Sequence, residues 1–591
     1  MKKPSKSKKA QSAPAKKTSS QQSAIFIRWR FYLILFFIFL AFATLVGRAA
    51  YIQIIEPDNL IHQSDLRTVR AKTIHSARGI ISDRNGEALA VSVPVDAVWA
   101  NPAIIMKKGA LKDKDRWYAL ADVLNLDREG LINKIRNSKN DKDEPRQFIY
   151  LQRQVNAAMA NYIRQLKLPG VGLKAESRRY YPAGEVSAHT VGVTGIDGHG
   201  LEGVERSYDK WLTGEAGKRI IRKDRYGHVV ENISLEKSEA GKPLTLTIDQ
   251  RIQAIAFRAV KQAMADYRAT SASAVMVDVK TGEVLAMVNA PSYNPNNRAD
   301  YQSYKMRNRV ITDAFEPGST VKPFVVLAAL ENGVADEHTI IDVGNGTMRI
   351  GGARVRDSDR IVGGKASLQM ILKKSSNVGV SKLSLRMPIE ALLGMYNSVG
   401  LGETSGLNLP GESTGIFPTR TRWSDFERAT IAFGYGLAIT PIQLAHAYAT
   451  LGNMGKYQPL HLIEGHRQAN LEHQVADPKY VREVLDMLET VTQPGGTAVK
   501  AAVPGYRIAA KTGTSRKAIA GGYSDEYFAY TAGVAPVSNP RLSLVVMVNE
   551  PQGDSYYGGA VAGPVFGEIM KGALQILNIA PDENKVTDDQ K

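Results

Sequence analysis

One long apolar run lies near the start of the chain, and a much longer stretch follows in which strand and helix patterns alternate. Seventeen uncharged, mostly apolar residues separate Arg30 from Arg48, and a helix needs roughly 17 to 25 residues to cross a bilayer. Apolar residues 49–55 extend the run, and the stem of Arg48 can carry its charge to the interface. The pattern predicts a transmembrane signal-anchor helix over 31–55. A cleaved signal peptide is the alternative, but the run is long and lacks a clean A-x-A site.

Positive charge is concentrated before this run. The chain has 76 Lys and Arg against 58 Asp and Glu, a net charge of +18, and nine of the basic residues lie within residues 1–30. Positive segments stay in the cytoplasm, so we expect a basic cytoplasmic tail over 1–30 and an exported remainder. That remainder has no zinc-finger or RNP-type motif, which argues against a nucleic-acid partner. The chain has no cysteine, which excludes disulfides, thiolate metal sites and a cysteine nucleophile.

A first exported module is expected over 56–235. Strand patterns at 78–94 and a helical pattern at 159–169 are separated by many turn signals, so we predict a mixed α/β module. No nucleophile–base pair or metal-ligand cluster stands out in it. Glu202 and Glu205 fit one solvated face of a helix better than a catalytic pair.

A larger domain is predicted over 236–577. Its first strand gives way to an amphipathic helix, and a pair of apolar strands about a K-T-G turn then predicts a hairpin buried on both faces. A buried strand and a helix close the domain. These patterns lie at 244–264, 273–291, 542–551 and 563–577. We expect the polar segment 578–591 to be a flexible tail.

Three short patterns, S-x-x-K, S-x-N and K-T-G, together describe a serine acyl-transfer site. Ser319 is the candidate nucleophile, because it follows E-P-G and opens a helix that is apolar all round. Free N–H groups and the dipole at that helix terminus favour an alkoxide. Lys322 lies one turn later, and burial is expected to lower its pKa so that it can accept the serine proton. The alternative is a capping serine followed by a surface lysine.

The other matches to S-x-x-K stand in different surroundings. Ser5 precedes the membrane run, and Ser207 and Ser234 lie in polar stretches, so none can build a dry, preorganised site.

The S-x-N candidate is Ser375-Ser376-Asn377, which lies between two helical runs. Ser375 can relay a proton between Lys322 and a leaving amine, and the Asn377 amide can hold the lysine and a peptide carbonyl. Taken alone, this triplet favours a helix cap and turn.

The K-T-G candidate, Lys511-Thr512-Gly513-Thr514, ends a strand-like segment. Gly513 permits another backbone to approach, as when an extended peptide adds along a strand edge. Lys511 and the hydroxyls of Thr512 and Thr514 can bind a substrate carboxylate. The earlier K-T-G, at Lys280, is better explained as the hairpin turn.

The segments EPGSTVKP, KSSNVGVSKL and AAKTGTSRK, in this order, resemble the transpeptidase domain of class B penicillin-binding proteins. RGIISDRNGEALA, SRRYYPAGEVSAH and YYGGAVAGPVF are similar to the division-specific members of Gram-negative bacteria. The resemblance implies an α+β fold with one N-terminal transmembrane helix, an elongated pedestal (dimerisation) domain and a C-terminal domain shared with serine β-lactamases, an antiparallel sheet flanked by helices. It implies a single-pass protein of the inner membrane at the division septum, with a periplasmic catalytic domain and no cofactor or metal.

By the same resemblance, Ser319 attacks a stem pentapeptide and releases the terminal D-alanine. An amine of a neighbouring stem then resolves the acyl-enzyme into a cross-link, and β-lactams acylate the same serine. Division proteins, including a septal glycan polymerase, are implied as partners. The implied roles are base for Lys322, relay and clamp for Ser375 and Asn377, carboxylate site for Lys511, Thr512, Gly513 and Thr514, oxyanion hole for the backbone N–H groups of Ser319 and Thr514, and aromatic wall for Tyr556 and Tyr557.

Two other functions share these motifs. A D,D-carboxypeptidase or β-lactamase sends water rather than an amine to the acyl-enzyme, but the predicted pedestal and uncleaved anchor argue against it. A β-lactam sensor or divisome scaffold acylates without turnover. The anchor and pedestal fit partner binding in either case, so scaffolding and catalysis are compatible.

Overall fold

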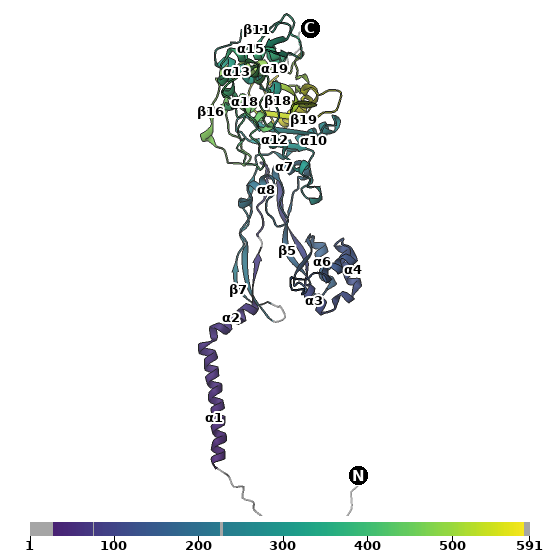
Figure 1. The fold of residues 1–591 in the computed structure, drawn as a ribbon, viewed down its shortest axis with the longest axis vertical. Helices are drawn as coiled ribbons and strands as arrows, with labels where there is room; N and C mark the ends of the chain where they lie inside the picture. The colour runs from purple at the N-terminus through teal and green to yellow at the C-terminus, as the bar shows by residue number, and fades with distance from the viewer. Residues whose placement is uncertain (1–27, 75, 225–228, 584–591) are drawn as a thin grey trace, which may run out of the picture. The chain divides into compact units, whose positions relative to one another are not determined.

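The computed structural model describes residues 28–74, 76–224 and 229–583, and the chain divides into two compact units (Figure 1). The first unit comprises residues 1–73 and 218–236. The second unit comprises the rest of the chain.

The first unit begins with a long apolar helix. α1, Arg28–Ala50, continues as a π-helical turn, Tyr51–Ile55, and no α1 side chain is buried by protein. The segment Arg28–Ile54 is long and apolar enough to cross a membrane. The helix predicted over 31–55 is therefore confirmed as one apolar helical segment, which starts at Arg28. Of the predicted basic tail, residues 1–27 lie outside the described residues.

A short helix and three strands complete this unit. The helix is α2, Pro57–Thr68, and the sheet has the order β1-β6-β7. Arg222 forms ion pairs with Asp65 of α2 at 3.0 Å and with Glu231 at 2.8 Å, which ties the helix to the sheet. The strands are β1 Val69–Ile74, β6 Gly217–Lys223 and β7 Val229–Glu236.

The N-terminal module of the second unit is built on one long strand. β3, Ala88–Ala100, pairs antiparallel with β2, β4 and β5, and helices α3 to α6 enclose a separate hydrophobic core around Trp117. The strand and helix patterns at 78–94 and 159–169 are thereby confirmed. The remaining bounds are β2 Ile81–Ser82, β4 Ile149–Val155, β5 Val171–Tyr180, β8 Leu244–Thr245, α3 Pro102–Lys107, α4 Lys114–Val123, α5 Arg128–Arg136 and α6 Ala157–Leu166.

The predicted solvated position of Glu205 is wrong. Glu205 lies on α8, Gly203–Ser207, and its side chain is fully buried. It accepts from Arg78 Nε at 2.5 Å and from Arg179 Nε at 2.6 Å, and both arginines are buried as well. The carboxylate leaves water because two guanidinium groups replace its hydration, a compensation that helical periodicity cannot reveal.

The large domain is organised on a five-stranded antiparallel sheet, in the order β10-β9-β19-β18-β17. β9 and β10 are buried at every position, as the predicted hairpin requires. Gly282 of the first K-T-G turns between them with φ +79°, so this K-T-G is indeed a hairpin turn. The strands are β9 Ser271–Asp278, β10 Val284–Ala290, β17 Ala509–Ile519, β18 Gly522–Ala535 and β19 Leu542–Asn549.

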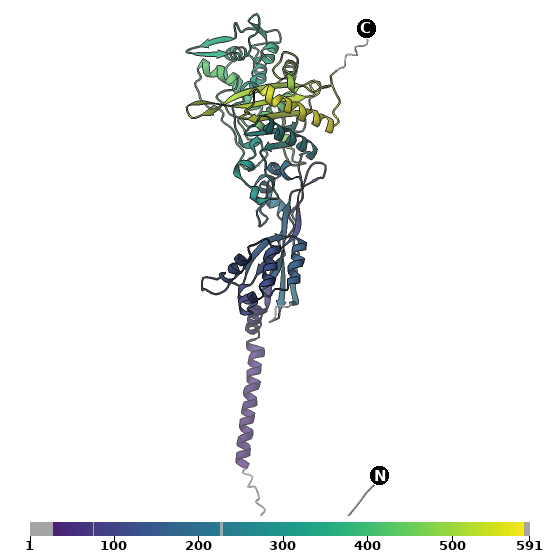
Figure 2. The same cartoon turned by 90° about the vertical axis from the view of Figure 1, so that its right-hand side faces the viewer.

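Helices flank this sheet (Figure 2). α10, Gln250–Asp266, and α20, Gly558–Ile576, pack against each other and against the strands. All residues of α18, Pro441–Gly452, are buried. On one side Ser543 of β19 donates to Ala445 O at 2.8 Å, and on the other the ring of Tyr448 contacts Phe324 of α13, Lys322–Glu331. α18 therefore connects the sheet to the helices beyond it.

A second group of helices and small hairpins completes the domain. Its helices are α13 Lys322–Glu331, α14 Leu368–Lys373, α15 Asn377–Arg386, α16 Ile389–Ser398, α17 Asp425–Ala432 and α19 Pro478–Glu489. Its strands are β11 Ile340–Asp342, β12 Thr347–Ile350, β13 Ala353–Arg356, β14 Lys365–Ser367, β15 Lys456–Tyr457 and β16 His473–Gln474. Short helices at the junction with the first module are α7 Ala188–Val191, α9 Asp209–Leu212, α11 Ser303–Met306 and α12 Arg309–Thr312.

The flexible tail predicted over 578–591 is wrong for its first six residues. Tyr506 donates to Ile579 O at 2.7 Å, and the Asp582 carboxylate accepts from the backbone N–H groups of Arg507 at 2.7 Å and Ser538 at 3.0 Å. A side-chain hydroxyl and two backbone N–H groups, from two distant segments around residues 506–507 and 538, hold this polar segment in place. Residues 584–591 lie outside the described residues.

Replacing Glu205 tests the buried charge cluster of the first module. Glu205→Ala leaves two buried guanidinium groups without their shared carboxylate, and breaking such a pair costs about 3–5 kcal/mol. We expect a clearly lower unfolding midpoint of the full chain in detergent, measured by differential scanning fluorimetry. The exposed Glu144→Ala is the matched control and should leave the midpoint unchanged. An unchanged midpoint for Glu205→Ala would show that the cluster contributes nothing to stability.

Candidate active site

The candidate serine lies on a helical turn that neighbouring backbone fixes. Residues Gly318–Val321 form a 3-10 turn that leads into α13. Gly318 has φ +47° and donates its N–H to Gly434 O at 3.0 Å, and a Cβ on Gly434 would lie 2.1 Å from the Gly318 oxygen. Ser319 stands within this turn, partly exposed, as the sequence predicts for the start of a buried helix. Its hydroxyl has no hydrogen-bond partner among residues 28–74, 76–224 and 229–583.

Lys322 is fully buried one turn after Ser319. Its Nζ donates to Ser375 O at 2.6 Å and to Asn377 Oδ1 at 2.6 Å, and it lies 3.2 Å from Ser375 Oγ. Burial, reinforced by the charge of Lys511, lowers the pKa of Lys322 well below its ordinary value. The surface-lysine alternative is thereby excluded.

The two short contacts decide what a neutral Lys322 can do. A neutral amine has two N–H bonds and one lone pair, and the carbonyl oxygens of Ser375 and Asn377 can only accept. Both N–H bonds are therefore committed to these oxygens. The lone pair is left for a hydroxyl proton, which is the arrangement that a general base needs.

Ser375 occupies a backbone position that usually belongs to glycine. Its φ is +58°, directly after α14, and the N–H groups of Ser375 and Ser376 bond to Leu372 O at 3.2 Å and Ile371 O at 2.9 Å. This pair of bonds is a Schellman ending, in which the left-handed residue is normally Gly. A serine pays a steric cost here, and its hydroxyl lies between Lys322 and Lys511.

Ser376 and Asp357 hold the triplet in place. Ser376 caps α15 by accepting from Gly379 N at 2.9 Å, so the helix-cap interpretation is right for this middle residue. Asp357 accepts from Ser376 Oγ at 2.8 Å and from Val378 N at 2.9 Å. Sequence reasoning missed Asp357, since no motif marks it and its only signal is a carboxylate in the turn after β13.

Lys511 reaches the same hydroxyl from the sheet. It is fully buried in β17, and its Nζ donates to Ser375 Oγ at 3.0 Å and to Thr512 O at 3.2 Å. Burial lowers the pKa of Lys511 to about 7. The second K-T-G lies inside the strand rather than at its end, because β17 starts only at Ala509. Within the described part of the chain, no group of three His, Cys, Asp or Glu residues is placed to hold a metal.

The threonines of β17 are engaged on other contacts. Thr512 donates to Thr497 Oγ1 at 3.0 Å, and Thr514 Oγ1 accepts from Gly558 N at 2.9 Å. Side chains alternate between the two faces of a strand, so Thr512 and Thr514 lie on one face of β17 and Lys511 lies on the other. Tyr557 directly precedes Gly558, and it stacks on Tyr556 with ring centroids 4.6 Å apart. Both tyrosines are exposed beside the end of the K-T-G-T segment.

Gly513 is required by a buried ring. A Cβ at Gly513 would lie 1.9 Å from the ring of Tyr530, its partner on β18. The Tyr530 hydroxyl donates to Glu316 O at 2.9 Å, just before the turn that carries Ser319. The close approach at Gly513 is therefore made by a side chain of the protein, which connects β17 to the serine turn. Sequence reasoning missed Tyr530, which no motif marks.

Known protein families match most of this chain. Residues 272–571 match the Penicillin binding protein transpeptidase domain, and residues 73–246 match the Penicillin-binding Protein dimerisation domain. An Escherichia coli K12 protein named "Peptidoglycan D,D-transpeptidase FtsI" is 51% identical over 575 residues, which is 97% of this chain and 96% of its own. The chain belongs to the class B penicillin-binding proteins of the FtsI family. The resemblance seen in the sequence is thereby confirmed.

Solved penicillin-binding proteins share the fold. A peptidoglycan synthetase from Bifidobacterium adolescentis has a TM-score of 0.68 and 27% identity, covering 88% of this chain and 98% of its own. Penicillin binding protein 3 from Mycobacterium tuberculosis, solved in complex with aztreonam, has a TM-score of 0.65 and 27% identity, with coverages of 87% and 98%. The α+β architecture, with an N-terminal apolar helix, a dimerisation domain and a transpeptidase domain, is confirmed for this class B penicillin-binding protein.

Two substitutions at Ser375 distinguish the effect of its hydroxyl on acylation from the effect of its backbone strain on stability. Ser375→Gly and Ser375→Ala both remove the hydroxyl, but only alanine keeps a side chain at φ +58°. We expect the glycine variant to be more stable than the alanine variant by about 0.5–1 kcal/mol. Acylation by a fluorescent penicillin should fall about 10²-fold in both variants. Equal stability of the two would contradict the strain, and unchanged acylation would contradict a role for the hydroxyl.

The low pKa of Lys511 makes stability depend on pH. Between about 7 and the ordinary value of 10.5, the unfolded chain binds a proton at this lysine that the folded chain does not. The free energy of unfolding therefore rises with pH across this window, by up to about 1.4 kcal/mol per pH unit for this group. Lys511→Met removes the contribution, so its unfolding midpoint should rise less than that of the wild type between about pH 7 and about pH 9. Equal slopes would contradict the lowered pKa.

Proposed function

We propose that this class B penicillin-binding protein is the peptidoglycan D,D-transpeptidase that cross-links stem peptides of the septal cell wall in cell division, with Ser319 as its nucleophile. The observation that carries the proposal is the environment of Lys322. It is a fully buried amine of lowered pKa, one turn after a partly exposed serine, with both N–H bonds committed to carbonyl oxygens. A base so prepared suits deprotonation of a neighbouring hydroxyl.

Acylation starts with this proton transfer. The Ser319 hydroxyl gives its proton to Lys322 Nζ, and its oxygen attacks the carbonyl of the penultimate D-alanine. The backbone N–H groups of Ser319 and Thr514 receive the developing oxyanion. The proton then passes through Ser375 Oγ, which lies within 3.2 Å of Lys322 Nζ, to the nitrogen of the departing D-alanine. The C–N bond breaks and an ester on Ser319 remains.

Cross-linking reverses the proton path. The amine of an acceptor stem attacks the ester carbonyl, loses a proton through Ser375 to Lys322, and Ser319 leaves with that proton. Asn377 holds the lysine on one side and a substrate carbonyl on the other. We assign the donor carboxylate to the K-T-G-T segment, where the Thr514 hydroxyl donates to it while Lys511, on the other face of β17 beside Ser375, contributes its charge. Thr512 and Gly513 fix the strand that carries both residues. Tyr556 and Tyr557 form the outer wall of this cleft.

The other segments of the chain hold this site at the membrane, near its substrate. We propose the division into a cytoplasmic tail (1–30), a membrane anchor (31–55), a pedestal (56–235) and a transpeptidase domain (236–577). The nine early basic residues support an orientation with the N-terminus in the cytoplasm and the catalytic domain in the periplasm. The inner membrane at the septum, and contact with division proteins such as a septal glycan polymerase, complete the proposal.

The deciding experiment is intact-mass analysis of the full chain in detergent with a fluorescent penicillin. The wild type should gain one adduct, and Ser319→Ala none, because among the S-x-x-K serines that the structure describes Ser319 alone is followed by a buried lysine. Ser234→Ala is the matched control, since it removes the serine of another S-x-x-K from an exposed strand and should still be acylated. A thioester analogue of the stem and a D-amino-acid acceptor then test turnover.

The outcomes discriminate among the candidate functions. Amine-dependent product together with a Ser319-dependent adduct supports the transpeptidase. Hydrolysis alone would indicate a carboxypeptidase or β-lactamase, and a stable adduct without turnover would indicate a sensor or scaffold. An adduct that survives in Ser319→Ala would overturn the assignment of the nucleophile.

A further inference from the structure

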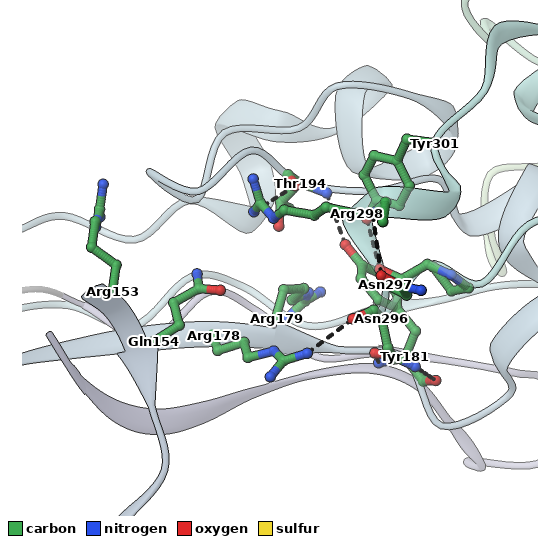
Figure 3. Close-up of a pocket in the computed structure, with 12 residues that line it drawn as sticks. Arg153, Gln154, Arg178, Arg179, Tyr181, Thr194, Asn296, Asn297, Arg298 and Tyr301 are labelled. Atoms are coloured by element: carbon green, nitrogen blue, oxygen red, sulfur yellow. Dashed lines mark hydrogen bonds between the residues drawn. The ribbon is translucent and has the colours of Figure 1, made fainter. Parts of the chain in front are cut away.

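A cavity rich in arginine lies at the junction of the first module and the large domain, within the second unit. Its volume is about 250 Å³, and no carboxylate side chain lines it. None of the residues assigned to the acyl-transfer site contributes to its walls. Four of its lining residues are arginines (Figure 3). Arg153 lies on β4, Arg178 and Arg179 lie on β5, and Arg298 lies in the segment after β10.

The four guanidinium groups differ in how far their charge is compensated. Arg153 is paired with Glu176 at 3.0 Å and with Asp197 at 2.7 Å. Arg178 and Arg298 have no carboxylate within 4 Å in the described residues. Their hydrogen bonds go to backbone oxygens, those of Asn296 at 2.9 Å and of Thr194 at 3.4 Å. Neither guanidinium is therefore ion-paired, although the Asp197 carboxylate that binds Arg153 is near enough to Arg298 for this charge to help lower the pKa of Asp197.

Arg179 adds a buried donor that is left unsatisfied. Its side chain is 4% exposed, and its Nε is paired with Glu205 at 2.6 Å. Its Nη1 contacts Arg78 O at 3.4 Å and Ser92 Oγ at 3.3 Å, whereas its Nη2 has no partner. A buried donor without a partner costs about 1–3 kcal/mol and is usually paired with protein or ordered water, so a bound acceptor that reached Nη2 would remove this cost.

Neutral polar groups complete the walls. Figure 3 shows Arg298 above Arg178 and Arg179, with Asn296 closing one end of the group. Asn296 is fixed by two hydrogen bonds to the backbone of Tyr181, at 3.0 and 2.9 Å. Hydrogen bonds to the backbone of the first module and of the large domain therefore fix the side chains that line the cavity.

We propose that this cavity binds an oxyanion, a carboxylate or phosphate group carried by a small ligand. A guanidinium offers paired N–H donors that match both groups, and uncompensated arginines are the usual means of holding them. A single water occupies about 30 Å³ of liquid, so a cavity of this size has room for the anion and part of the body that carries it. Two sources of the anion are open to an exported chain, free phosphate and the peptide carboxylates of muramyl peptides.

The position of the site gives the ligand a structural role. β4 and β5 belong to the first module, whereas Arg298 belongs to the segment that runs from β10 towards the Ser319 turn. An anion bound by both Arg178 and Arg298 therefore connects the first module to the large domain through two ion pairs. The site is independent of the proposed acyl transfer, because it uses none of the same side chains.

The test is direct binding to the full chain in detergent at fixed ionic strength. Inorganic phosphate and a muramyl tripeptide, which lacks D-Ala-D-Ala, are titrated separately by isothermal calorimetry. Arg298→Gln removes an exposed guanidinium with one long hydrogen bond, so the fold should be kept, and Arg178→Gln is the second variant. Arg136→Gln, an exposed arginine of α5 in the same module, is the matched control for net charge.

We expect saturable binding of at least one probe, weakened about tenfold or more by each cavity variant and less than about twofold by the control. The probe that binds tighter identifies the source of the anion. Penicillin labelling of Ser319 should be unchanged in both variants, which separates this site from the acyl-transfer site. Absence of saturable binding for both probes, or equal weakening by Arg136→Gln, would overturn the proposal.

Discussion

Two buried lysines that share one serine hydroxyl are the constraint on which the rest of the transpeptidase domain depends. Lys322 and Lys511 lie 3.2 and 3.0 Å from Ser375 Oγ, and neither side chain is exposed. Two ammonium groups so close in a dry interior repel each other and lose their hydration, so the neutral form is favoured. Desolvation, which would destabilise an ordinary salt bridge, here produces an amine able to take a proton at neutral pH.

Keeping these lysines dry requires the whole domain. α13 carries Lys322 among residues that are buried from Lys322 to Leu330, and α18 fills the space between that helix and the sheet. β17 brings Lys511 from the other side. Tyr530 connects the two, since its ring covers Gly513 and its hydroxyl bonds to Glu316 O. The site therefore belongs to the packing of helix against sheet rather than to any one element.

Local patterns in the sequence account for the elements and most of the site. The apolar run, the buried hairpin and the helix after Ser319 follow from periodicity, and the three motifs identify Ser319, Lys322, Ser375 and Lys511 as candidates. What the sequence could not reveal depends on contacts between distant segments. Glu205 is buried only because Arg78 and Arg179 come to it, and residues 578–583 are held by contacts with distant segments around Tyr506 and Ser538. Asp357 and Tyr530 stand in no motif, so only the fold identifies them.

The order of strands also determines when the domain can form. β9 pairs with β19 throughout, so that Ala274 lies opposite Val546, and the central strand pair joins segments from the two ends of the domain. Contacts so distant in sequence make folding slow, because a long loop must close before the pairing stabilises it. Because a chain is synthesised from its N-terminus, the sheet cannot be completed until β19, which ends at Asn549, has been made. Ser319 emerges long before Lys511, and until then it is an ordinary serine.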